Sequence, residues 1–123
     1  MTIAPLVPMC LPDITDAERR EVLEVLESPS LALGPRLEAF ERSFSRRLGL
    51  RHGIGVNSGT SGLHLAMIVA GVGDGDVVLT TPFSFVASAN CILYERARPV
   101  FVDVDPERLT IDVAALEDRV ERL

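Results

Sequence analysis

The sequence of 123 residues contains no lysine, and all 12 of its basic side chains are arginine. Lysine is the side chain that forms Schiff bases with carbonyl cofactors and substrates. Arginine cannot replace it, because the guanidinium group stays protonated at any ordinary pH. The chain therefore carries no lysine for imine chemistry, and any mechanism of that kind needs a lysine from other residues.

Three further scarcities exclude other classes of function. The two cysteines, Cys10 and Cys91, have no CxxC spacing, which argues against a zinc site or a redox pair. Basic residues are outnumbered, and the formal charge of −6 leaves no basic face for nucleic acid. No apolar run approaches the roughly 18 residues of a membrane helix, and the N-terminus lacks a basic leader. We expect a cytoplasmic protein with neither nucleic acid nor membrane as a partner.

The first part of the chain predicts two amphipathic helices after an extended segment. Residues 15–18 read Thr-Asp-Ala-Glu, the capping-box pattern, so a helix is expected to begin there and end near Ser28. A second helix is expected to begin at Pro35, after Gly34, and to stop at Gly49. Its apolar residues recur at spacings of three and four, which is typical of a helix packed on one face.

From residue 53 onward, short β-prone runs alternate with helical runs. This alternation predicts an α/β fold with parallel strands joined by helices. The helix that opens at Thr60 is apolar almost all round, which predicts burial on more than one side. Three strands are few for a parallel sheet with both faces covered, so we expect an incomplete sheet. The predicted strands are 54–56, 77–80 and 100–104, and the predicted helices are 60–70, 84–94 and 113–123, the last capped by Asp112.

A glycine- and hydroxyl-rich loop, VNSGTSG at 56–62, connects the first predicted strand to the first helix of this region. Gly59 and Gly62 permit a tight turn, and the free amides at a helix start attract a phosphate. Capping of a buried helix by Ser58 or Thr60 explains the same residues equally well. The loop matches neither a Walker loop nor a GxGxxG fingerprint, so nucleotide readings of those kinds are excluded.

A second candidate segment, Pro82 to Ala87, follows the predicted strand at 77–80. Ligands of open α/β sheets gather at the carboxyl ends of the strands. An aromatic side chain such as Phe85 could stack there on a flat cofactor ring, whereas core packing of Phe83 and Phe85 is the simpler alternative.

Five pieces of sequence stand in a fixed order along the chain: GP at 34–35 with FE at 40–41, VNSGTSGL at 56–63, GDGDVV at 73–78, TPFSFVA at 81–87 and PVFVDVD at 99–105. Taken together, these motifs resemble the DegT/DnrJ/EryC1/StrS family of sugar aminotransferases. Their order and spacing match the N-terminal portion of that family over nearly the whole chain. The resemblance implies an α/β fold, the N-terminal part of the large domain of fold-type I pyridoxal-phosphate transferases, with helices on a mainly parallel, incomplete sheet.

The resemblance implies a role for four residues. Gly59, Thr60 and Ser61 would hold the phosphate of pyridoxal 5'-phosphate, and Phe85 would stack on its pyridine ring. Ser58 would support the loop rather than touch the cofactor. The family's Schiff-base lysine and its pyridinium aspartate have no counterpart here, so no catalytic residue is assigned.

At the level of the whole protein, the resemblance implies a transaminase that uses an amino donor to aminate a nucleotide-linked keto sugar. Such enzymes serve amino-sugar, polysaccharide or antibiotic biosynthesis and form active sites at a homodimer interface. Residues 1–123 would be one segment of the large domain, divided into 1–52 and a βαβαβα unit at 53–123. On this interpretation the chain alone is an inactive fragment.

Several alternatives remain. The chain could be a non-enzymatic half-domain that binds phosphate compounds or a partner protein, or a small flavodoxin-like nucleotide binder. Asp103 and Asp105 end a predicted strand and are interpreted as structural, with no metal assigned. His64 is expected to be a hydrogen-bonded packing residue, and His52 a solvated one.

The absence of lysine gives a direct spectroscopic prediction. Mixed with pyridoxal phosphate, the chain should show no imine absorbance band once its N-terminal amine is blocked. A band that survives this blocking would contradict the assignment of the reactive amine to residues outside 1–123.

Overall fold

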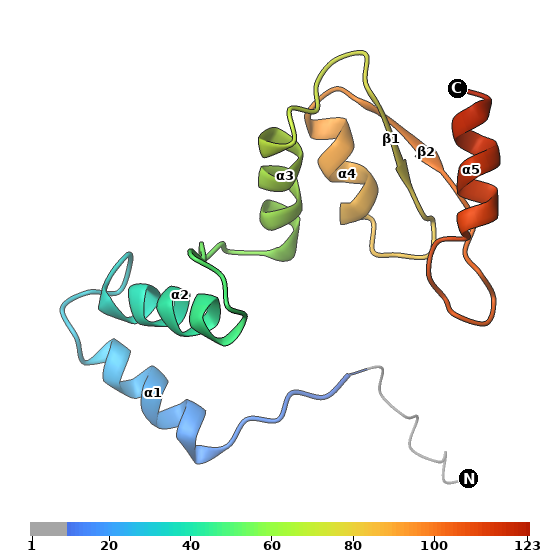
Figure 1. Ribbon diagram of the computed structural model, residues 1–123. Coiled ribbons are helices and arrows are strands. Elements are labelled where there is room, and N and C mark those ends of the chain that lie inside the picture. The colour runs from blue at the N-terminus through green and yellow to red at the C-terminus, as the bar shows by residue number, and fades with distance from the viewer. Residues whose placement is uncertain (1–9) are drawn as a thin grey trace, which may run out of the picture. The chain divides into compact units, whose positions relative to one another are not determined.

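The computed structural model describes residues 10–123, which form two compact units that divide between Gly55 and Val56. The first unit contains the helices α1 (Asp16–Leu26) and α2 (Pro35–Arg47). The second contains, in order, α3 (Gly59–Val69), β1 (Val77–Thr80), α4 (Ala87–Tyr94), β2 (Arg98–Phe101) and α5 (Val113–Glu121) (Figure 1). No helix within residues 10–123 is long and apolar enough to cross a membrane.

The helix starts in the first unit follow the local sequence signals. The Thr15 hydroxyl accepts the amide of Ala17 at 3.2 Å, and the Glu18 carboxylate accepts the amide of Thr15 at 2.7 Å. This reciprocal bonding confirms the predicted capping box. α2 begins at Pro35, as predicted, and Gly49 follows its end with a φ of +67°, a conformation that favours glycine.

The second unit is built on a parallel pair of strands. β1 and β2 pair in register from Val77 opposite Arg98 to Thr80 opposite Phe101. α4 connects the two strands and packs against both of them and against α3. The core between these elements is small, and its fully buried apolar residues are Ala87, Cys91, Ile92, Ala97, Val100 and Val102.

Two predictions of strands need correction. Residues 54–56 form no strand, and Ile54 is 80% exposed, because no other strand among the described residues pairs with this segment to complete a ladder. The predicted strand at 100–104 is shifted to Arg98–Phe101, and Val104 instead forms an isolated antiparallel bridge with Ile111. The predicted β-α-β-α-β-α order therefore becomes α-β-α-β-α from α3 onward.

The prediction that α3 is buried on several sides is also wrong for this chain. None of its residues is fully buried, and Val69 is 87% exposed. The apolar surface of α3 exceeds what α4, the helix packed against it in this unit, covers. The same imbalance is seen in the sheet, which has two strands where a covered parallel sheet has more.

The capping box makes a prediction about the acid side of the pH range. The hydrogen bond from the Thr15 hydroxyl, followed by backbone amides, lowers the pKa of Glu18 below its usual 4.5. A lowered carboxyl pKa stabilises the folded state above the unfolded value, and this contribution is lost as pH falls through the folded value. In Thr15→Ala, the Glu18 pKa measured by carbon-detected NMR should return toward 4.5. An unchanged pKa would show that the hydroxyl is not the cause.

The small core predicts that a single truncation is costly. Ile92 is 2% exposed, and Ile92→Ala should lower the free energy of unfolding by about 2–5 kcal/mol. Val69→Ala in the same unit removes an apolar side chain that is already exposed and should change it by less than about 0.5 kcal/mol. Urea unfolding followed by circular dichroism measures both, and equal losses would contradict the described packing.

Candidate functional site

The loop between residues 54–56 and α3 is organised by a helix cap. Ser58 is the N-cap residue, and its hydroxyl accepts the amide of Ser61 at 3.1 Å. The carbonyl of Ser58 accepts the amide of Gly62 at 3.2 Å. Within residues 10–123, the amides of Gly59 and Thr60 therefore keep no hydrogen-bond partner.

A second set of bonds ties the hydroxyl groups of this loop together. Ser61 donates its hydroxyl proton to the Asn57 side-chain oxygen at 2.6 Å, and the hydroxyls of Ser58 and Ser61 lie 3.0 Å apart. Because the one hydroxyl proton of Ser61 goes to Asn57, Ser58 is the donor in the shared bond. This role of Asn57 is not predicted from the sequence. The signal for it is that an asparagine just before a helix cap commonly accepts local hydrogen bonds.

The resulting surface suits an anion. The two free amides lie at the positive end of an 11-residue helix, and a Cβ built on Gly59 would meet no atom within 4 Å. The Thr60 hydroxyl is a further donor without a bond to the described residues. Donors, helix dipole and open space together fit the phosphate of a cofactor. They do not by themselves identify the cofactor.

The predicted aromatic segment lies in the same unit. Phe85 is 76% exposed and borders a hollow beside the ends of both strands, lined by Thr81, Pro82, Ser84, Phe85, Val86, Ser88, Ala89 and Phe101. In Figure 1 the first residues of α3 and α4 lie at the same end of the unit as the last residues of β1 and β2. The loop and the hollow thus lie at the carboxyl edge of the strands, where α/β sheets bind ligands.

The acidic and histidine side chains belong to other arrangements. Asp105 accepts the amides of Glu107 and Arg108, at 2.8 and 2.9 Å, and so shapes a turn. Among residues 10–123 no three potential ligands cluster as a metal site would require. His64 bonds Glu95 at 2.6 Å and contacts Tyr94 edge-on, the packing role expected for it.

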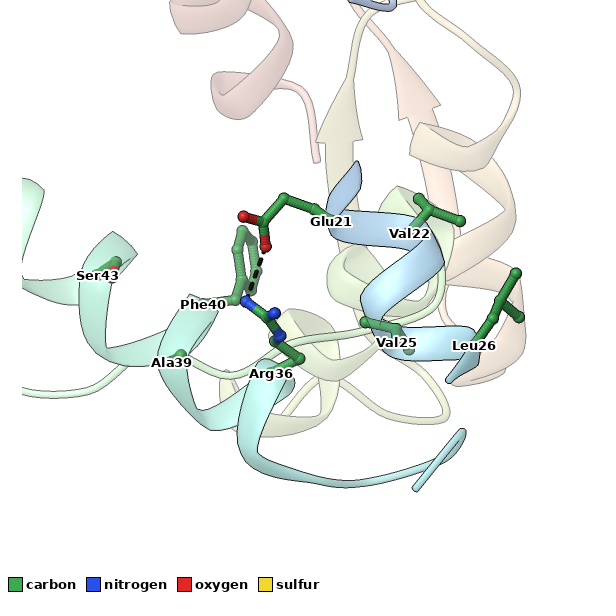
Figure 2. Close-up of a pocket in the computed structure, with 8 residues that line it drawn as sticks. All are labelled: Glu21, Val22, Val25, Leu26, Arg36, Ala39, Phe40 and Ser43. Carbon is green, nitrogen blue, oxygen red and sulfur yellow. Dashed lines mark hydrogen bonds and ion pairs between the residues drawn. The ribbon is translucent and has the colours of Figure 1, made fainter. Parts of the chain in front are cut away.

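A separate apolar groove lies between α1 and α2 in the first unit (Figure 2). Its one cationic side chain, Arg36, pairs with Glu21 at 2.7 Å and also with Glu24. Because two carboxylates pair with the one guanidinium, the groove offers no net positive charge to a phosphate. The residues that line it are Glu21, Val22, Val25, Leu26, Arg36, Ala39, Phe40 and Ser43.

Known proteins are similar to this chain in both sequence and structure. The chain is 43% identical over 114 residues to the spore coat polysaccharide biosynthesis protein SpsC of Bacillus subtilis, covering 93% of this chain and 29% of SpsC. It is 39% identical to the UDP-4-amino-4-deoxy-L-arabinose–oxoglutarate aminotransferase of Shewanella sediminis, covering 90% and 29%. The PLP-form structure of Spr1654 from Streptococcus pneumoniae superposes with a TM-score of 0.84 at 34% identity, covering 91% and 29%.

These matches show both the class of fold and the family of the chain. Its fold is part of the large domain of fold-type I pyridoxal-phosphate aminotransferases, as predicted from the sequence. The model of the DegT/DnrJ/EryC1/StrS aminotransferase family matches residues 12–123, and the chain belongs to that family. It spans about three-tenths of the length of the relatives that it matches, 29% in both cases above.

The cap and the free donors should separate in a stability measurement. Ser58→Ala removes the hydroxyl that accepts the Ser61 amide and should lower the free energy of unfolding by about 1 kcal/mol. Thr60→Val removes a hydroxyl that bonds no described residue and should cost less. Urea unfolding without phosphate compares the two variants, and a larger loss for Thr60→Val would contradict the described bonding.

Proposed function

We propose that residues 1–123 form the cofactor-phosphate segment of a pyridoxal-phosphate-dependent aminotransferase that acts on nucleotide-linked keto sugars. One observation carries this proposal. The free amides of Gly59 and Thr60 open α3 at the carboxyl edge of the strands, and the exposed ring of Phe85 borders the hollow beside Thr81 and Phe101 at that edge. A phosphate donor set and a flat apolar ring at the same edge match a cofactor that has a phosphate on one side and an aromatic ring on the other.

Each residue has a distinct task in this site. Gly59 and Thr60 donate their amides to the phosphate, and the Thr60 hydroxyl adds a third donor. Phe85 offers its face to the pyridine ring. Ser61 adds a fourth donor only if its hydroxyl turns away from Asn57, which accepts its proton at 2.6 Å.

The remaining chemistry is assigned to residues outside this chain. Pyridoxal phosphate, when bound, acts as an electron sink for transamination. The reaction also needs a lysine, and the 12 basic residues here are all arginine. We therefore infer that the whole protein supplies the lysine, takes an amino donor and a nucleotide-sugar substrate, and forms a cytoplasmic homodimer. Residues 1–52 and 53–123 would then belong to one large domain.

An activity assay tests the proposal on the protein expressed from the whole reading frame that contains residues 1–123. Mixed with pyridoxal phosphate, oxoglutarate and a nucleotide-linked amino sugar, this protein should release glutamate and the keto sugar. Residues 1–123 alone should release neither. The whole reading frame could instead encode only this lysine-free chain. If the chain is then a stable monomer that binds phosphate compounds tightly, the enzyme proposal is wrong and the non-enzymatic half-domain is the correct interpretation.

The two parts of the site should respond to different probes. Phe85→Ala should weaken the binding of pyridoxamine phosphate by about 1–3 kcal/mol, the contribution of a base stacked on an aromatic side chain. The affinity for inorganic phosphate should not change. Thr60→Val should weaken both, because the hydroxyl serves the phosphate that they share. Equilibrium dialysis measures both affinities. If Phe85→Ala binds pyridoxamine phosphate with unchanged affinity, Phe85 does not stack on the cofactor ring.

A further inference from the structure

The ring of Phe85 has little side-chain packing to hold it. It is 76% exposed, and its neighbour Val86 is 58% exposed. A side chain with about three quarters of its surface exposed is confined little by packing, so its position depends mainly on its backbone. The question is what holds the backbone of residues 82–86, which form neither helix nor strand.

Two hydroxyl groups bracket this segment. At its start, the Thr81 hydroxyl accepts the amide of Phe83 at 3.2 Å. At its end, the hydroxyls of Ser84 and Ser88 share a hydrogen bond with an Oγ to Oγ distance of 2.8 Å. The amide of Ser88 also bonds the carbonyl of Phe85 at 3.0 Å. The residue that bears the ring is thus spanned by a side-chain bond and a backbone bond to one serine.

Ser88 is itself well anchored. It lies in the first turn of α4, directly after Ala87, which is 5% exposed. Its carbonyl accepts the thiol of Cys91 at 3.4 Å, and Cys91 is 2% exposed in the core. Ser88 therefore connects the exposed segment to the most firmly packed helix of the unit.

We propose that Ser88 is a positioning residue, which fixes the Phe85 ring against the cofactor by holding Ser84. This inference rests on the proposed function, because it assigns a role toward the same cofactor. The backbone bond from Ser88 to Phe85 fixes the end of the segment, and the hydroxyl bond to Ser84 fixes the residue before the ring. At the other end, the Thr81 hydroxyl fixes the backbone by accepting the amide of Phe83.

The proposal predicts a split between two probes of the site. Pyridoxamine phosphate has both the ring and the phosphate and needs no lysine to bind, whereas inorganic phosphate has no ring. Ser88→Ala breaks the bond to Ser84 and should weaken the binding of pyridoxamine phosphate about 2- to 10-fold, which is what the loss of one hydrogen bond costs. Inorganic phosphate affinity should not change, because its donors lie on α3. A merely structural loss would weaken both.

The experiment uses the protein from the whole reading frame that contains residues 1–123, with affinities from equilibrium dialysis. Ser88→Thr keeps the hydroxyl and should restore wild-type affinity, and Ser84→Ala should reproduce the loss. The double variant Ser84→Ala with Ser88→Ala should lose no more than either alone. Ser43→Ala, on α2 in the first unit, is the matched control and should have no effect.

The outcomes separate this inference from the proposed function. If the wild-type protein binds pyridoxamine phosphate no better than inorganic phosphate, the proposed function fails. If the wild type prefers pyridoxamine phosphate and Ser88→Ala keeps the full preference, Ser88 has no positioning role. If Ser88→Ala does not fold, Ser84→Ala decides, since Ser84 lies in the exposed segment outside the helix.

Discussion

The candidate site depends on one hydrogen bond, from the amide of Ser61 to the hydroxyl of Ser58. By taking the third amide of α3, this cap fixes where the helix begins and leaves the amides of Gly59 and Thr60 without partners. A helix that began one residue later would direct other amides at the same space. Capping and phosphate binding, which compete as interpretations of the sequence, are therefore complementary in the structure. Ser58 caps, and its two successors remain free for an anion.

The second constraint is the shortage of covering surface. Six apolar residues within 10–123 are buried, while large apolar side chains on every helix of this part of the chain are exposed. A chain that spans 29% of its relatives has only part of the surface against which such a sheet and such helices pack. The exposed apolar residues of α3 fit this account, since α4 packs against this helix and leaves its other apolar residues exposed.

The sequence predicted those features that are decided locally. Thr15, Ser58 and Asp112 begin helices because a side-chain oxygen reaches an amide two or three residues away. The predicted strand at 54–56 and the predicted burial of α3 are wrong for this chain. Each feature depends on a partner that is distant in sequence, which local patterns do not show. The fold class and the family were recognised from motifs, and the comparisons confirm both. The roles of Gly59, Thr60, Ser61 and Phe85 stay predictions, and the bonds of Asn57 and Ser88 emerged only from the structure.

The central claim is that α3 receives the cofactor phosphate on its first free amides. The most direct measurement is a ¹⁵N NMR titration of the chain with pyridoxamine phosphate, in which the amide protons of Gly59 and Thr60 are followed. These two resonances should shift downfield together and saturate with one affinity, while those of Ser61 and Gly62, already bonded to Ser58, should move less. Unchanged Gly59 and Thr60 resonances alongside saturable shifts elsewhere, for example in the groove between α1 and α2, would contradict it.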